Sequence, residues 1–396
     1  MQKLASLFEK HQAQTTSYPI GLEIVRAKGC YLYDQNNKRY LDLVAGVSAC
    51  SLGHRHPKVV RAIKKQLSKY LHVMVYGEFV QKEPVLLTKL LADNLPKPLD
   101  TTYLTNSGTE AIEGALKLAK RVTGRAEIIA AKNAYHGNTM GAMSVMGYEE
   151  RKRAYRPLIP GTTFIDFNEV DAINHITTKT AAIILETIQG GAGFIVPQHG
   201  YLKRIKERCE EVGALLILDE IQPGMGRTGK LFAFMDHNMV PDILVTGKGL
   251  GGGLPVGAFI AARHHMAQLK EAPALGHITT FGGNPVVAAA CRATLSTILN
   301  SNLMAETLEK EHLFRELLVH NKIKEIRGKG LMLALIMDTP KCAQNLVKES
   351  LNSGILLFFL LFEPKAVRIS PPLTISKKQI KYACKKILQL LDGLDC

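Results

Sequence analysis

The stretch ALLILDEIQ at residues 214–222 decides the fold, because an uninterrupted apolar run ends there in two carboxylates. Near-continuous hydrophobicity of this kind is typical of strands that are buried on both faces of a parallel sheet. Helix-like periodic segments such as residues 201–212 alternate with such runs, which predicts an α/β fold with a mostly parallel sheet. The other apolar runs of the middle part lie at residues 128–131, 163–165, 181–185, 243–245 and 257–261.

The two ends of the chain differ from this middle part. Residues 20–45 predict a short meander of strands and turns, and the C-terminal quarter mixes helices with short strands near residues 329–334 and 366–369. We expect the two ends to form one small domain together, from residues 1–60 and 291–396. Residues 61–290 would then form the large domain.

The net charge of +15 raises the question of nucleic-acid binding. The basic residues are interspersed with acidic ones, as in KRIKER at residues 203–208, and no recognised nucleic-acid motif accompanies them. A basic surface that favours anionic substrates is the preferred interpretation, and no nucleic-acid partner is predicted.

No segment predicts a membrane or secretory role. The longest apolar run, residues 355–362, is too short to span a bilayer, and residues 1–16 lack the apolar core of a signal peptide. The seven cysteines are widely spaced without a CxxC pair, which predicts reduced thiols and neither a disulfide framework nor a zinc site. We therefore expect a cytoplasmic protein.

A lysine and an aspartate stand at the ends of two predicted strands. Lys248 lies among glycines in TGKGLGGG at residues 246–253, and Asp219 ends the apolar run at residues 214–218. A buried lysine has a lowered pKa and can act as a nucleophile that forms an imine. A buried carboxylate needs a partner, and a protonated pyridine nitrogen is a suitable one. Pyridoxal phosphate (PLP) chemistry requires at least these two groups. A role as a helix cap, as a metal ligand or in a salt bridge would also explain Asp219.

A phosphate site is predicted at TNSGTEA, residues 105–111, which opens a segment with apolar residues at helical spacing. The start of a helix exposes unpaired backbone N–H groups, and the helix dipole adds positive charge there. An ordinary helix cap would use the same residue types. Tyr135 follows the strand at residues 128–131, where it could stack on a planar ring or simply pack against its neighbours.

Other phosphate and metal motifs fit the sequence poorly. The segment around Lys248 lacks the Ser or Thr that follows the lysine of a Walker motif, and its glycines do not have the spacing of a dinucleotide fingerprint. His54 and His56 have no carboxylate organised nearby in the sequence. A structural role is preferred for these histidines, and no metal site is predicted.

Taken together, these segments resemble the class III (ω-amino acid) PLP-dependent aminotransferases of fold type I, and most closely their acetylornithine and ornithine aminotransferase branch. The most specific match is LDEIQPGMGRTG at residues 218–229, followed by GKGLGGG at residues 247–253. The likeness extends from YLYD at residues 31–34 to RISPPL at residues 368–373. It implies a large domain with a mostly parallel seven-stranded sheet beside a small α+β domain.

The resemblance also implies how PLP would be held. Lys248 would form the internal aldimine and then shuttle a proton, and Asp219 would pair with the pyridine nitrogen. Gln222 would contact the phenolic oxygen, and Tyr135 would stack on the ring. The remaining cofactor contacts would come from Ser107, Gly108 and Thr109 at the phosphate, and from His136 and Glu186.

The same resemblance implies how substrates would bind. Arg368 would bind the substrate α-carboxylate, because a guanidinium matches a planar anion with two parallel hydrogen bonds. Asn138 and Thr279 would also lie at the substrate end. Thr280 matches a family position that reaches the phosphate bound in the neighbouring subunit. A homodimer with shared active sites is therefore implied.

Two positions depart from the acetylornithine and ornithine branch. Asn138 stands where the branch usually has an arginine that contacts a substrate carboxylate. Gly191 stands where it usually has a glutamate that can neutralise the α-carboxylate arginine. Both changes remove a charge-assisted contact, so the use of glutamate and 2-oxoglutarate does not carry over to this chain.

The function that the resemblance implies is the transfer of an amino group between an amino acid and a 2-oxo acid by a ping-pong mechanism. The donor would be an ω-amino acid or an ornithine-like compound. The second hypothesis is an aminomutase, decarboxylase or racemase on the same scaffold. The fold indicates which cofactor is used but not which reaction is catalysed. A non-catalytic cofactor-binding module is the third, and the presence of both Lys248 and Asp219 disfavours it.

Overall fold

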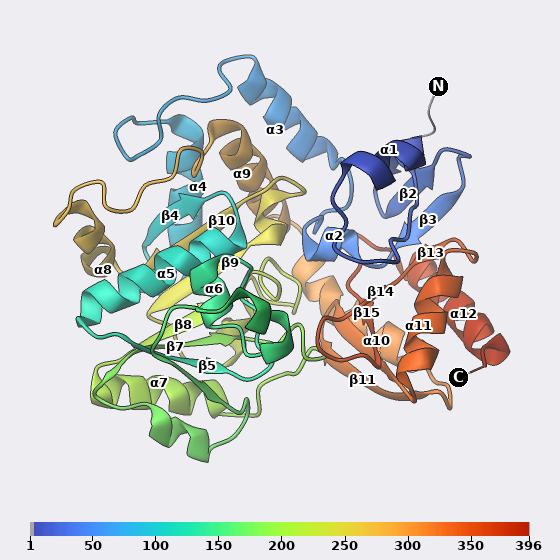
Figure 1. Cartoon of the computed structure of the whole chain (residues 1–396). Helices are drawn as coiled ribbons and strands as arrows, with labels where there is room; N and C mark the ends of the chain where they lie inside the picture. Colours follow the sequence, from blue (N-terminus) through green and yellow to red (C-terminus); the bar gives the residue numbers. More distant parts are fainter. Residues whose placement is uncertain (1–3, 396) are drawn as a thin grey trace.

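The computed structural model describes residues 4–395, which form a large sheet with helices on both faces and a smaller part beside it (Figure 1). The large sheet has seven strands in the order β4-β10-β9-β8-β7-β5-β6. β10 is antiparallel to both of its neighbours, and the other strand pairs are parallel. In chain order the strands are β4 Thr101–Thr105, β5 Glu127–Ala131, β6 Thr162–Ile165, β7 Thr180–Glu186, β8 Leu215–Asp219, β9 Ile243–Gly247 and β10 Gly257–Ala261.

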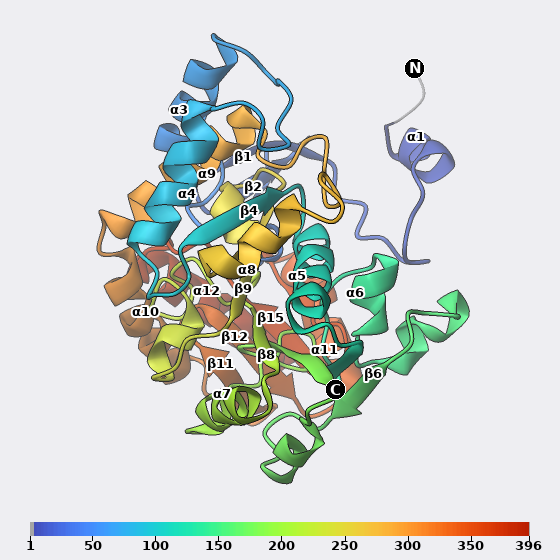
Figure 2. The same cartoon turned by 90° about the vertical axis from the view of Figure 1, so that its left-hand side faces the viewer.

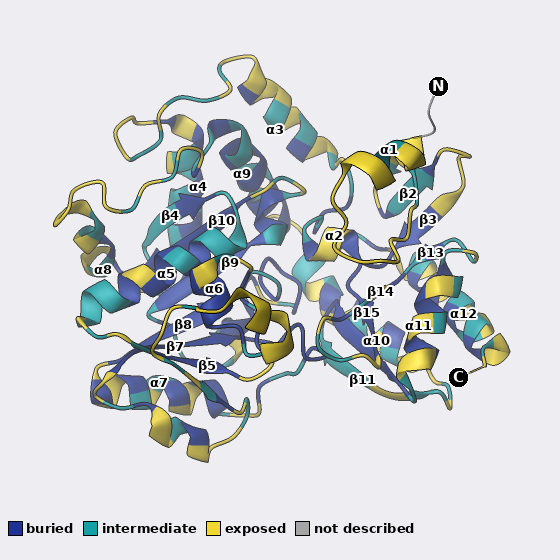
Figure 3. Cartoon of the chain, viewed as in Figure 1, coloured by how far each residue is buried: buried dark blue, intermediate teal, exposed yellow. Residues whose placement is uncertain are grey.

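The alternation of side chains along each strand explains why the sheet is buried on both faces. In β8, Leu215 and Ile217 pack in one apolar cluster with helix α5, while Leu216 and Leu218 pack in a second cluster on the opposite face. Every residue of β7, β8, β9 and β10 is buried, which Figure 3 shows as a dark blue centre. The near-continuous apolar runs of the sequence are the consequence of this two-sided burial.

Helices of the large part lie on both sides of these strands. Figure 2 shows α4 on one side of β4 and α5 on the other. The apolar cluster on the sheet face away from α5 contains buried residues of α4, α7 and α9. The helices of this part are α3 Pro57–Leu67, α4 Lys82–Asp93, α5 Gly108–Thr123, α6 Met140–Ser144, α7 Tyr201–Val212, α8 Arg263–Ala267 and α9 Pro285–Leu299. Short 3-10 helices are η1 Glu149–Arg151, η2 Arg153–Tyr155, η3 Asp171–His175, η4 Ala233–Asp236, η5 Lys248–Gly251 and η6 Gln268–Lys270.

The smaller part is built from both ends of the chain. One four-stranded sheet has the order β1-β2-β3-β13, and a second has the order β11-β12-β15-β14. The strands are β1 Ile24–Lys28, β2 Tyr31–Asp34, β3 Arg39–Asp42, β11 Ile323–Lys329, β12 Met332–Met337, β13 Ile355–Leu356, β14 Phe358–Phe359 and β15 Ala366–Ile369. Its helices are α1 Leu4–His11, α2 Ala45–Ser48, α10 Leu303–Leu317, α11 Pro340–Ser350 and α12 Lys377–Gly393.

The pairing of β3 with β13 joins the two ends. The strands are parallel, with Leu41 opposite Ile355, and both of these side chains are fully buried. The proposal that the two ends share one small domain rests on this pairing. The boundaries at residues 60 and 290 remain a prediction.

Two features of the structure were not foreseen. Strand β4, the outermost strand beside β10, is absent from the apolar runs of the sequence because TTYLT is mostly polar. Cys342 is disulfide-bonded, so the prediction of reduced thiols is wrong for this residue, whereas Cys30, Cys50, Cys209, Cys291 and Cys384 are free. Among residues 4–395, no helix is both long enough and apolar enough to cross a membrane.

Candidate active site

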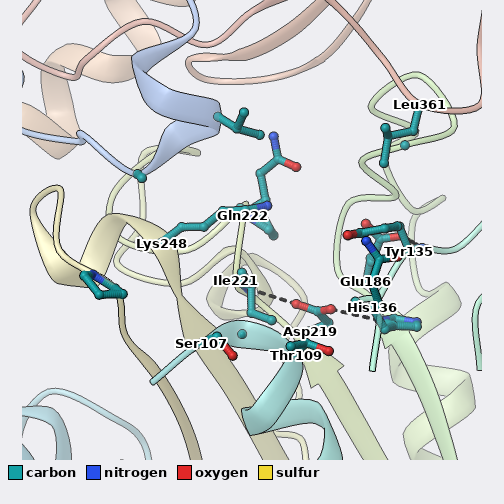
Figure 4. Close-up of a pocket in the computed structure, with 18 of the residues that line it drawn as sticks. Ser107, Thr109, Tyr135, His136, Glu186, Asp219, Ile221, Gln222, Lys248 and Leu361 are labelled. Atoms are coloured by element: carbon teal, nitrogen blue, oxygen red, sulfur yellow. Dashed lines mark hydrogen bonds and ion pairs between the residues drawn. The ribbon is translucent and has the colours of Figure 1, made fainter. Parts of the chain in front are cut away.

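A cavity of about 770 Å³ lies where the parallel strands end. Adjacent parallel strands place their carboxyl ends at one edge of a sheet, and Glu186 of β7 is in register with Asp219 of β8. The start of α5 and the end of β14 complete the wall. Figure 4 shows the side chains that approach one another there. The predicted site residues in the lining are Ser107, Gly108, Thr109, Tyr135, His136, Asn138, Glu186, Asp219, Gln222, Lys248 and Arg368.

Lys248 follows β9 directly and begins η5 in the left-handed region, with φ of +37°. A non-glycine residue in this region is uncommon and is often part of a functional site. Burial, and after it the cation of Arg368, lowers the pKa of Lys248 to about 8, while the carboxylate of Asp219 opposes the shift. The amine is therefore partly neutral near neutral pH, as a nucleophile must be.

Asp219 ends β8 with only 4% of its surface exposed. Its Oδ2 lies 2.8 Å from Nδ1 of His136, and its Oδ1 accepts a hydrogen bond of 3.0 Å from the backbone N–H of Ile221. Both contacts are drawn as dashed lines in Figure 4. They hold the carboxylate in one orientation and leave it lone pairs for a further donor in the cavity.

Glu186 forms a second buried carboxylate behind the first. Its Oε2 accepts from the backbone N–H of Tyr135 at 3.1 Å, and its Oε1 accepts from that of Gly190 at 2.9 Å. Burial raises the pKa of Glu186 to about 7; the nearby His136 lowers this pKa and Asp219 raises it. Glu186 therefore fixes the backbone at Tyr135 and at Gly190.

The start of α5 has the features of an anion site. Ser107 caps the helix by accepting a hydrogen bond from the backbone N–H of Glu110 at 3.3 Å. The first backbone N–H groups of the helix have no acceptor within it. Thr109 lies in the same wall, with its Oγ1 2.8 Å from Oγ1 of Thr139. A Cβ at Gly137, whose φ is +135°, would collide with Thr109, so glycine is required where the Tyr135 loop meets this helix.

Three polar side chains of the lining have buried nitrogen atoms without a hydrogen-bond partner among residues 4–395. They are Nε2 of Gln222, Nε2 of His136, and Nε and Nη1 of Arg368. Arg368 is 5% exposed on β15, and burial lowers the pKa of its guanidinium to about 10. Buried donors of this kind are rarely left unpaired, so the cavity has the polar groups of a binding site.

Comparison with known proteins shows the family. The family model for aminotransferase class-III matches residues 12–391. This chain belongs to the class III aminotransferases. It is 38% identical to the acetylornithine aminotransferase of Methanopyrus kandleri, over 98% of both chains. It is 39% identical to a LysW-aminoadipate semialdehyde/glutamate semialdehyde transaminase of Sulfolobus acidocaldarius, over 80% of this chain and 81% of that protein.

Solved structures show the same fold. Two crystal structures of the ornithine aminotransferase of Toxoplasma gondii are 31% identical to this aminotransferase, with a TM-score of 0.91. They match 98% of this chain, and the match covers 94% and 93% of theirs. One of the two is described as showing partial occupancy of PLP at its active site. The predicted fold class, with a mostly parallel seven-stranded sheet and a smaller α+β part, is confirmed.

Two predicted residues lie outside the cavity of this aminotransferase. Oγ1 of Thr279 accepts a hydrogen bond of 2.8 Å from Nδ2 of Asn106, and Thr280 is exposed. Neither residue lines the cavity. Asn138 does line it, and it is exposed. The structure of one chain therefore brings the other predicted residues together and leaves Thr279 and Thr280 outside the lining of the cavity.

The sequence did not identify several residues that shape the site. Glu220 is fully buried beside Asp219 and accepts from the backbone N–H groups of Ala233 and Phe234, at 2.9 and 2.7 Å. Apolar residues of the lining come from the run at residues 355–362, which the sequence analysis considered only as too short for a membrane span.

His54 contacts Asp42, with 2.7 Å between Nε2 and Oδ2. No three His, Cys, Asp or Glu side chains of the described chain gather as metal ligands would.

Proposed function

We propose that this class III aminotransferase uses PLP to move an amino group from an amino acid to a 2-oxo acid in a ping-pong reaction. The observation that supports this most is the convergence of Lys248, Asp219 and the unpaired guanidinium of Arg368 on one cavity. The family supports the cofactor, as does the PLP described in the Toxoplasma ornithine aminotransferase.

The residues present fit PLP. Asp219 would pair with the pyridine nitrogen, and the unpaired Nε2 of Gln222 is a donor for the phenolic oxygen. The phosphate would take the free N–H groups at the start of α5, together with the hydroxyls of Ser107 and Thr109. When bound, PLP supplies an aldehyde that takes up the amino group and a ring that accepts electrons from the substrate carbon.

The chain's own residues would perform the remaining tasks. Nζ of Lys248 would take the proton from the substrate carbon that carries the amino group, because its lowered pKa makes it a base near neutral pH. The contact with His136 would hold the carboxylate of Asp219 in the correct orientation. Arg368 would hold the substrate carboxylate with a paired hydrogen bond. Tyr135, beside these groups, would pack against the ring.

We also propose a homodimer in which Thr280 reaches the phosphate of the neighbouring subunit. Thr280 is exposed and lies outside its own cavity. The same loop exposes Leu275, Ile278 and Phe281, each close to half of its surface, which is unusual for large apolar residues on one short segment. Burial against a second copy would cover them.

Separation of the two half-reactions tests this function. An amino acid added alone should convert the bound cofactor to its amine form, with loss of the visible absorbance and release of one 2-oxo acid per site. A 2-oxo acid added next should restore the absorbance and release the new amino acid. A racemase or decarboxylase would release no 2-oxo acid, and that result would contradict the proposal.

A further inference from the structure

One part of the cavity lining is apolar. We call this the apolar wall, and it consists of Val47, Phe358, Phe359 and Leu361. Val47, Phe358 and Leu361 keep 37%, 39% and 40% of their surface exposed. Large apolar side chains rarely gather half-exposed around a cavity unless something binds there.

The apolar wall is directly beside the guanidinium that would hold the substrate carboxylate. Strand β14 pairs with β15, and Phe358 is opposite Arg368 in the antiparallel register. Leu361 follows this strand and lies above Tyr135 in the view of Figure 4. A molecule whose carboxylate contacts Arg368 would therefore have its remaining part against Phe358, Phe359 and Leu361.

Next to the apolar wall, the ring of Phe362 occupies the space that a side chain at position 191 would need. A carboxylate at that position, which could neutralise Arg368, therefore has no room. A Cβ at Gly191 would lie 2.7 Å from Cδ2 of the Phe362 ring, so no side chain fits there without displacing the ring. The ring stacks on Tyr148, with centroids 4.5 Å apart, and the backbone N–H of Phe362 donates to the carbonyl of Gly191 at 2.9 Å. This packing fixes an apolar group in place of a charged one.

The charges that this chain supplies to the cavity allow one substrate carboxylate. The lining of the described chain contains two cations, Lys248 and Arg368. Its two carboxylates, Asp219 and Glu186, already accept hydrogen bonds deep in the site and would not reach a distant ammonium group. Arg151 is exposed outside the lining, where its guanidinium carbon lies 5.7 Å from the centre of the Phe362 ring.

We propose that the substrate is an amino acid with a single carboxylate and an apolar remainder, which packs on Val47, Phe358, Phe359 and Leu361. A second carboxylate, as in glutamate, or a second ammonium group, as in ornithine, would have to be buried against this wall without a partner from the same chain. This proposal rests on the proposed function, because it specifies the substrate of the same site.

A series of straight-chain 2-amino acids of increasing length tests the proposal, with one 2-oxo acid held constant as the acceptor. Each added methylene is expected to raise kcat/KM about fourfold until the wall is covered, because burial of a methylene contributes about 0.8 kcal/mol. Glutamate and ornithine are expected to be at least about tenfold poorer than the best member. A flat series, or a preference for glutamate or ornithine, would overturn the proposal.

Equilibrium binding separates this inference from the reaction itself. Hexanoate and glutarate lack an amino group, so their affinities for the PLP-loaded protein, measured by calorimetry, do not depend on amino transfer. Tighter binding of hexanoate supports the apolar site even if no amino transfer occurs. Equal or tighter binding of glutarate contradicts it even if the protein is an active aminotransferase.

Three variants test whether the apolar wall causes the dependence of kcat/KM on chain length and the discrimination against glutamate. Leu361→Asn should remove most of the increase in kcat/KM with chain length. Leu308→Asn, on α10 and 48% exposed, is the matched control outside the cavity and should leave the increase unchanged. Arg151→Met should leave the discrimination against glutamate unchanged. An unaltered series in Leu361→Asn, or a loss of glutamate use in Arg151→Met, would show that the apolar wall does not select the substrate.

Discussion

At the scale of single residues, the pKa of Lys248 determines when the chain can capture its cofactor. Only the neutral amine attacks an aldehyde, and burial lowers the pKa of this lysine to about 8. The rate at which the cofactor-free protein takes up PLP should therefore rise as the pH rises through about 8 and level off above it. Stopped-flow absorbance across pH 6 to about 10 measures this midpoint.

Two variants should move the midpoint in opposite directions. Arg368 lowers the pKa of Lys248, so Arg368→Met should move the midpoint to higher pH. Asp219 raises the same pKa, so Asp219→Asn should move the midpoint to lower pH. A midpoint close to the ordinary lysine value in the unaltered protein would show that the amine is not in the buried environment described here.

The sequence allowed the position of Lys248 and Asp219 at one cavity to be predicted, but not the contacts around Gly191. Asp219 ends one strongly apolar strand and Lys248 directly follows another, and such strand ends meet at one edge of a parallel sheet. The contact between Gly191 and Phe362 joins residues far apart in the sequence, and no local pattern predicts it. The partners of Thr280 remain a prediction, because they would lie on a second subunit.

At the scale of elements, the packing of α5 against the sheet holds the start of the helix at the cavity. Gly114 faces Phe259 of β10 so closely that a Cβ would collide with the ring. Gly114→Ala should therefore lower the free energy of unfolding by about 1–3 kcal/mol and weaken PLP binding, because α5 must move. Denaturant unfolding and PLP titration measure the two effects.

Gly393 provides the matched control for this substitution. It is also a helical glycine, at the end of α12, but a Cβ there would meet nothing within 4 Å. Gly393→Ala should change stability by no more than about 0.5 kcal/mol and leave PLP affinity unchanged. Equal effects of the two substitutions would mean that the helix–sheet contact does not position the cofactor site.

Among the elements, the strands with the most buried residues are the ones that the sequence predicts. The six strands predicted in the middle of the chain are all in the large sheet. For β7, β8, β9 and β10 the reason is two-sided burial, which demands continuous apolar residues, whereas the edge strand β6 is only partly buried. β4 was missed because its first three residues are only half-buried and its sequence is polar. β13 and β14 have two residues each, which is too short for any alternation to show.

At the scale of the whole molecule, a shared active site predicts complementation between defective subunits. In a mixed dimer of Lys248→Ala and Thr280→Ala chains, one of the two sites would contain both native residues. Co-refolded mixtures should therefore form sites with native PLP affinity and turnover that neither parent dimer has. If each chain builds its site alone, every mixture should show only the average of the two parents.

The covalent anchor of the cofactor is the central claim, and borohydride reduction followed by peptide mapping tests it most directly. Reduction of the PLP-loaded protein should fix the cofactor on the ε-nitrogen of Lys248, in the peptide that joins β9 to η5. Mass spectrometry should find the added mass at that residue and find no such label on Lys248→Ala. A label on any other lysine, or none after PLP has bound, would contradict the account.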